Sequence, residues 1–152
     1  MHHVRRGAGR PLLLIHGLGS SWRSWSPILP ALEAEREVVA VDLPGFGETP
    51  APAGDGALRS LVHGPPQAGM PAGAARGPIV IGWGRRDLVC LPSQAARAIE
   101  RFPDARLHWF ERCGHFPQWD VPEHTSRLIL DTTDGAVIPT DAAHPAHPEQ
   151  AA

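Results

Sequence analysis

The stretch from Pro11 to Ser20, which reads PLLLIHGLGS, constrains the fold of this chain more than any other part of its sequence. Its first half is a short apolar run bounded by turn residues, which is typical of a strand buried on both faces of a parallel sheet. Gly17 and Gly19 follow at once, and glycine lets the backbone turn sharply and approach a ligand closely. The stretch therefore predicts a buried strand whose C-terminal end carries a ligand-facing loop.

A second buried strand is predicted over residues 38–43, and a turn rich in glycine and proline, PGFGET, follows it. Together with the His16-Gly17-Leu18-Gly19 loop, this pattern closely resembles the α/β-hydrolase fold family. In that family the loop after the first strand supplies one N–H of the oxyanion hole, which stabilises the negatively charged oxygen formed in acyl transfer. The resemblance places this donor at the backbone N–H of Leu18, next to Gly17.

The composition fits one small core and excludes several function classes. The 152 residues carry 14 basic and 16 acidic side chains, and this balance provides no basic field for nucleic acid. The apolar run behind the N-terminus is too short for a signal peptide or a membrane span. Two cysteines do not make a disulfide framework, so we expect a soluble, cytoplasmic protein with reduced thiols and neither nucleic-acid nor membrane partners.

Composition also divides the chain into four segments. Residues 1–50 and 78–132 hold the predicted strands and helices, and we interpret them as the N-terminal and C-terminal halves of an α/β-hydrolase core. Residues 51–77 contain six glycines and four prolines. Such a segment buries too little apolar surface to offset its ordering entropy, which predicts a linker or a mobile loop. Residues 133–152, rich in Ala, Pro and His, predict a disordered tail.

The local patterns predict a short α/β fold. Residues 1–10 indicate a lead-in or the remnant of an edge strand, and residues 21–36 indicate a helix that begins near a proline. Strands over 78–84 and 106–110 flank a helix over 92–102, and a last helix begins near Pro122. We therefore predict a truncated α/β-hydrolase fold, with a mostly parallel sheet of about four strands flanked by helices.

The pairing of the two halves has two possible outcomes. Both inner strands are continuous apolar runs that need neighbours on each side, so we expect strand 12–16 to pair with strand 79–83. The sheet order would then be 38–43, 12–16, 79–83 and 106–110. The alternative keeps the spacing of the family and leaves these two strands roughly 14 Å apart, with unpaired edges that favour self-association.

Two further motifs match the family residue by residue. Gly84-Arg85-Arg86-Asp87 follows the third strand, where the family places its triad acid, and the resemblance makes Asp87 that residue. Cys113-Gly114-His115 follows the fourth strand, where the family places its catalytic histidine, and His115 matches it. A histidine that accepts a proton from a nucleophile needs a carboxylate that fixes its tautomer and stabilises its cationic form. We therefore expect Asp87 and His115 to lie close together.

The nucleophile of the family is missing. Its Gly-x-Ser-x-Gly elbow should follow the strand after the PGFGET turn, but the pattern occurs nowhere in the sequence, and the residues 51–77 stand in its place. Ser20, Ser21, Ser60 and Cys90 are candidate replacements, and none carries the signature of a nucleophile. A serine at position 20 or 21 more often caps the helix that follows it. The nucleophile therefore stays unknown.

The sequence gives no reason to expect a metal or another cofactor. Nine histidines occur, but four of them lie near the termini, and no His-x-x-x-His or Cys-x-x-Cys pattern lies on a predicted element.

Three interpretations of the function remain open. The resemblance implies hydrolysis of an ester or a similar small substrate by Ser-His-Asp chemistry, with activity impaired by the missing serine. In the second interpretation, the chain is a non-catalytic remnant or a binding module. A third interpretation is an assembly in which another chain supplies the missing strands and the serine.

Overall fold

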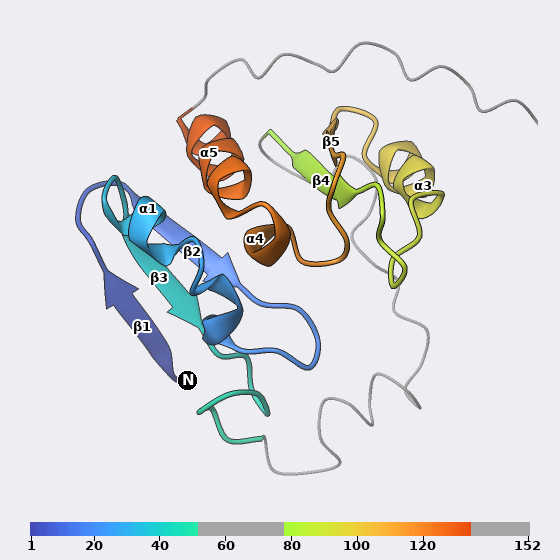
Figure 1. The fold of residues 1–152 in the computed structure, drawn as a ribbon. Coiled ribbons are helices and arrows are strands. Elements are labelled where there is room, and N and C mark those ends of the chain that lie inside the picture. Colours follow the sequence, from blue (N-terminus) through green and yellow to red (C-terminus); the bar gives the residue numbers. More distant parts are fainter. Residues whose placement is uncertain (52–77, 135–152) are drawn as a thin grey trace, which may run out of the picture.

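The computed structural model describes residues 1–51 and 78–134, which form two sheet-containing halves (Figure 1). In the first half, β1 (His3–Arg6), β2 (Pro11–Ile15) and β3 (Glu37–Val41) form a sheet in the order β1-β3-β2. Strand β2 runs parallel to β3, and β1 runs antiparallel to it. In the second half, β4 (Val80–Gly84) and β5 (Arg106–Phe110) form a parallel pair.

Short helices connect and cover these strands. The 3-10 helix η1 (Trp22–Trp25) and helix α1 (Leu29–Glu33) lie between β2 and β3 in the chain. Helix α3 (Gln94–Arg101) connects β4 to β5, and the helices α4 (Pro117–Asp120) and α5 (Pro122–Thr133) follow β5. The single helix predicted over 21–36 therefore forms as two short pieces. Pro27 and Pro30 explain the interruption, since proline lacks the N–H that a helix interior needs.

The main core packs α1 and α5 against one face of the first sheet. Its buried members are Leu14, Ile28, Leu29, Leu32, Val38, Ala40 and Leu130. Leu130 comes from α5, so the C-terminal half completes the core of the N-terminal half. Arg36, which is buried, also forms an ion pair with Asp134 at the end of α5. Helix α5 is thus the element that holds the two halves together.

The α/β class is confirmed, but the predicted pairing of the inner strands is wrong. Strands β2 and β4 belong to different sheets, and each is an edge strand among the residues that the structure describes. Burial on both faces is also wrong for β2, where Leu13 and Ile15 are 58% and 54% exposed while Leu14 is buried. The apolar pattern of a strand shows that it needs neighbours, and it does not show which neighbours it obtains.

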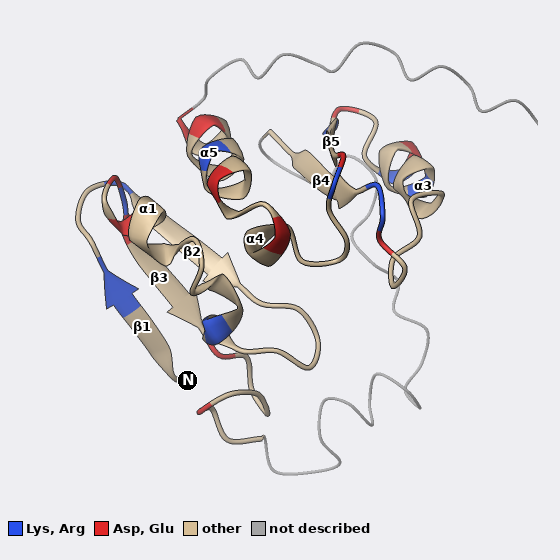
Figure 2. Ribbon diagram, in the orientation of Figure 1, with Lys and Arg blue, Asp and Glu red and all other residues tan. Residues whose placement is uncertain are grey.

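Several expectations concern residues that lie outside the described part of the chain. These are the linker over 51–77 from residue 52 onward, which includes Ser60, and the tail from residue 135 onward. Within the described part, no helix is both long and apolar enough to cross a membrane. Charged residues of both signs are interspersed through both halves (Figure 2).

Candidate active site

Asp87 and His115 meet at the carboxyl ends of the parallel strands β4 and β5. His115 Nδ1 lies 2.8 Å from Asp87 Oδ2, and the expected proximity of the two side chains is confirmed. An ionised carboxylate can only accept, so Nδ1 carries the proton and Nε2 is left with a free lone pair. This is the arrangement in which an imidazole can act as a general base.

Glycine at position 84 allows the loops that carry these two residues to pack together. A Cβ atom at Gly84 would lie 2.1 Å from the carbonyl oxygen of Gly114, which no real side chain tolerates. Backbone hydrogen bonds then fix the loops, because Arg86 N donates to the Cys113 carbonyl at 2.9 Å and Arg85 N donates to Phe110 at 3.0 Å. The geometry of the pair therefore rests on the backbone of both loops.

The Asp87 carboxylate is 5% exposed and is anchored on both oxygens. Its Oδ1 accepts hydrogen bonds from the backbone N–H groups of Val89 and Cys90, each at 2.8 Å. Burial by itself raises the pKa of Asp87, but the hydrogen bonds from His115, Cys90 and Val89 outweigh it and hold the pKa below its ordinary value. Asp87 is therefore a fixed anion that orients His115.

The predicted oxyanion loop, residues 16–20, is held in place by His16. This histidine is buried, its Nδ1 donates to the Gly17 carbonyl at 2.7 Å, and its Nε2 accepts from Leu43 N at 3.0 Å. Both ring nitrogens are thus engaged, and His16 serves to tie the loop to the end of β3. The role of the Leu18 and Gly17 backbone in an oxyanion hole stays a prediction.

Asp42 locks the turn after β3 and is a residue whose role the sequence analysis did not identify. Its fully buried carboxylate accepts from Trp22 N at 2.7 Å, Glu48 N at 2.9 Å and His2 Nδ1 at 2.9 Å. Burial raises the pKa of Asp42, and these hydrogen bonds lower it further than burial raises it. Position 47 requires glycine for two reasons. Its φ of +55° disfavours other residues, and a Cβ atom there would lie 2.3 Å from the Asp42 carboxylate.

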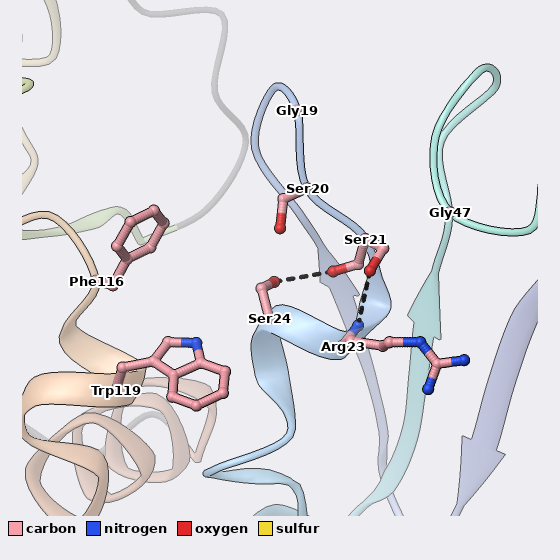
Figure 3. A pocket seen from close by; sticks show the side chains of 8 residues that line it. All are labelled: Gly19, Ser20, Ser21, Arg23, Ser24, Gly47, Phe116 and Trp119. Carbon is pink, nitrogen blue, oxygen red and sulfur yellow. Dashed lines mark hydrogen bonds between the residues drawn. The ribbon is translucent and has the colours of Figure 1, made fainter.

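A cavity of about 620 Å³ lies between the loop after β2 and the loop after β5 (Figure 3). Ser20, Ser21 and Ser24 line one side, and the aromatic rings of Phe116 and Trp119 face them from the other. Ser21 Oγ accepts from Arg23 N at 3.3 Å and so caps η1, which is the structural role expected for a serine here. The cavity is large enough for a small-molecule substrate.

A second cavity, of about 200 Å³, reaches His115 itself. Asp87, Cys90, Trp83 and His115 are among the residues that line it. Of the candidate replacements for the nucleophile within the described residues, Cys90 therefore lies beside the Asp87–His115 pair, whereas Ser20 and Ser21 line the larger cavity. Cys90 lies three residues after Asp87 in the same loop, and the packing of the loop after β4 against the loop after β5 brings it close to His115.

Comparisons with known proteins agree with this architecture. The sequence model of the α/β hydrolase fold family matches residues 10–68. Over 50 residues the chain is 46% identical to the pimeloyl-(acyl-carrier protein) methyl ester esterase of Legionella pneumophila (strain Lens), an alignment that covers 33% of this chain and 21% of that protein. It is 44% identical over 52 residues to the soluble epoxide hydrolase of Corynebacterium sp. (strain C12), covering 34% of this chain and 18% of that protein.

A similarity of fold extends over most of the chain. A thermophilic esterase from Thermogutta terrifontis superposes with a TM-score of 0.70 at 13% sequence identity, over 88% of this chain and 93% of the other. The sequence alignments with the curated relatives, in contrast, span only about a fifth of the length of those proteins.

Proposed function

Because the chain belongs to the α/β-hydrolase fold family, we propose that it derives from an enzyme that hydrolyses a small ester or a similar substrate. Asp87 and His115 act as its acid–base pair, and the backbone N–H of Leu18, beside Gly17, is its oxyanion donor. The observation that carries the proposal is the 2.8 Å contact between His115 Nδ1 and Asp87 Oδ2. The cavity between Ser20 and Phe116 is the proposed substrate site.

We propose that turnover is impaired, because the sequence contains no Gly-x-Ser-x-Gly elbow. Without a serine, His115 Nε2 can still take a proton from a water molecule while the resulting hydroxide attacks the ester carbonyl. Triads that lose a member keep about 10³–10⁴-fold catalysis over water through the oxyanion hole and binding. An internal truncation that removed the elbow and the cap accounts for this loss, and no cofactor is needed for the remaining chemistry.

Within the described part of the chain β2 is an edge strand with an exposed apolar face, and both features support a second candidate, an assembly completed by another chain. Leu13 and Ile15 are more than half exposed on this strand. Such a surface is apolar enough to receive strands from a partner or from a second copy. A non-catalytic binding module is the remaining alternative. The free cysteines Cys90 and Cys113 favour a reducing, cytoplasmic location for any of these roles.

Hydrolysis of a p-nitrophenyl ester tests the proposal. We expect weak hydrolysis above the buffer rate by the native chain, and a loss of this increment in His115→Ala. Since any exposed histidine attacks activated esters, His3→Ala is the matched control, because His3 is exposed on β1. An equal loss in both variants, or no loss in His115→Ala, would show that His115 has no role in hydrolysis.

Asp87→Asn separates the orienting role from the base itself. The amide can donate to His115 Nδ1 and so favours the wrong tautomer, an exchange that lowers turnover about 10⁴-fold in a complete serine protease triad. We expect Asp87→Asn to remove as much of the increment as His115→Ala. A variant that retains the native rate would contradict the pairing as the source of activity.

A further inference from the structure

Asp87, Cys90 and His115 form a three-residue cluster, and neither the fold family nor the proposed hydrolysis requires its cysteine. One carboxylate oxygen, the Cys90 sulfur and one imidazole nitrogen all lie within 4.8 Å of one another. We propose that these three residues bind a thiophilic divalent cation, with zinc as the ion that fits best, and that the bound ion disables the acid–base pair.

The donor set is that of a zinc site with an open position. Zinc is bound by cysteine sulfur at about 2.3 Å, histidine nitrogen at about 2.0 Å and carboxylate oxygen at about 2.0–2.2 Å, and three protein ligands leave the fourth position for water. A thiolate among the ligands excludes magnesium and calcium, which prefer oxygen. Cys90, Asp87 and His115 supply one ligand of each kind that zinc accepts.

Cys90 is held in position by its own backbone. Its N–H donates to Asp87 Oδ1 at 2.8 Å, and its carbonyl accepts from Trp83 Nε1 at 3.0 Å. The carboxylate that would bind the ion therefore also fixes the loop that carries the thiol. Such support of one ligand by another is what keeps metal ligands oriented.

Only small movements convert the cluster into a tetrahedral site. Ligand atoms around zinc stand about 3.3–3.6 Å apart, given the bond lengths above. The 2.8 Å contact between His115 and Asp87 must open by about half an ångström, and the thiol must approach by at most about 1.2 Å. The His115 side chain is 34% exposed and Cys90 is half-buried, so both can adjust. The adjacent cavity of about 200 Å³ has room for a water molecule as fourth ligand.

Binding of the ion releases one proton, and His115 can then no longer act as a base. The Cys90 thiol loses its proton to solvent when it becomes a thiolate ligand. The imidazole stays neutral because its proton moves through solvent from Nδ1 to Nε2, which leaves Nδ1 with the lone pair that binds the ion in place of the hydrogen bond to Asp87. An imidazole bound in this way no longer has Asp87 to orient it. Metal binding and acid–base chemistry at His115 are therefore mutually exclusive.

Cobalt(II) is the probe that reports this site directly, because thiolate ligation to cobalt gives an intense near-ultraviolet charge-transfer band. Histidine-only sites, such as those that His2 and His3 or the tail histidines could form, lack this band. We expect the band on addition of cobalt(II) to the native chain, and its loss when equimolar zinc is added. The absence of the band in the native chain overturns the proposal.

The two cysteines provide the matched variants. Cys113 is fully buried and does not belong to the cluster of Asp87, Cys90 and His115. We expect Cys113→Ser to keep the cobalt band, and Cys90→Ser and His115→Ala to lose it or to weaken cobalt binding at least tenfold. A band lost in Cys113→Ser and kept in Cys90→Ser overturns the proposal.

Alkylation of the native chain gives a second measurement that needs no variant. We expect iodoacetamide to modify Cys90, which is half-buried, and zinc to slow this reaction at least tenfold, as read by peptide mass spectrometry. An unchanged rate in the presence of saturating zinc overturns the proposal. Neither readout depends on ester hydrolysis, so a failure of the metal site and a failure of the proposed function are distinguishable.

Discussion

Replacing Asp42 by asparagine tests whether the turn after β3 is held by a buried anion. The carboxylate is fully buried and accepts hydrogen bonds from Trp22 N, Glu48 N and His2 Nδ1. An asparagine keeps one acceptor oxygen and turns its amide toward at least one of these donors. The substitution therefore breaks a charge-assisted hydrogen bond and leaves a buried N–H unsatisfied.

The expected loss of stability in Asp42→Asn combines a lost hydrogen bond, an unsatisfied buried N–H and a smaller cost of burying the side chain. A hydrogen bond to a charged group contributes about 1.5–3 kcal/mol, and an unsatisfied buried donor costs about 1–3 kcal/mol. The neutral asparagine offsets part of this loss, because burying the charged carboxylate of Asp42 itself costs free energy. We expect Asp42→Asn to lower the free energy of unfolding by about 2–4 kcal/mol, which corresponds to a shift of about 1–2 M in the urea midpoint.

Urea unfolding followed by far-ultraviolet circular dichroism measures this shift. Asp104→Asn is the matched control, because Asp104 is exposed in the turn before β5 and should leave the midpoint unchanged. Equal midpoints for the two variants would refute the account of Asp42 as the anchor of this turn.

Three further perturbations have expected outcomes. Leu130→Ala removes the contribution of α5 to the first core and should lower the free energy of unfolding by about 2–4 kcal/mol, as measured by urea unfolding. The folded-state pKa values of Asp42 and Asp87 lie below the ordinary 3.8, so the stability that these carboxylates provide is complete above pH 3.8 and is lost as the pH falls through the lowered values. Acid unfolding followed by circular dichroism measures this loss. A free energy of unfolding that does not change between neutral pH and pH 2 would contradict it. Leu13→Lys should reduce any self-association seen by sedimentation velocity, because Leu13 is exposed on the β2 edge strand, whereas Leu88→Lys, on a loop and 87% exposed, should not.

The sequence predicts the strands from local apolar patterns, and it predicts the Asp87–His115 pair from the resemblance to the α/β-hydrolase fold together with the strand–helix–strand unit that carries both residues. Each apolar run is bounded by turn residues, and parallel strands bring the loops at their carboxyl ends to one edge of the sheet. Asp87 and His115 each follow such a strand, and so their proximity is set once β4 and β5 pair in register from Val80 to Gly84.

Other features depend on packing that no local pattern encodes. The exposure of Leu13 and Ile15 follows from which strands pair with β2, and a continuous apolar run is equally compatible with pairing on both sides. The contact between His2 and Asp42 joins residues that are 40 positions apart. The sequence offers Cys90 as one of four candidate nucleophiles, and only the tertiary fold shows that it lies beside His115.

We propose that the chain keeps the acid–base pair of a hydrolase without the serine that the pair would activate. Treatment with a serine-directed fluorophosphonate, followed by intact-mass spectrometry and the p-nitrophenyl ester assay, tests this claim directly. We expect no covalent adduct and no change in the weak, His115-dependent hydrolysis. A stoichiometric adduct on Ser20 or Ser21 that abolishes hydrolysis would contradict the claim and identify a nucleophile in the cavity beside Phe116.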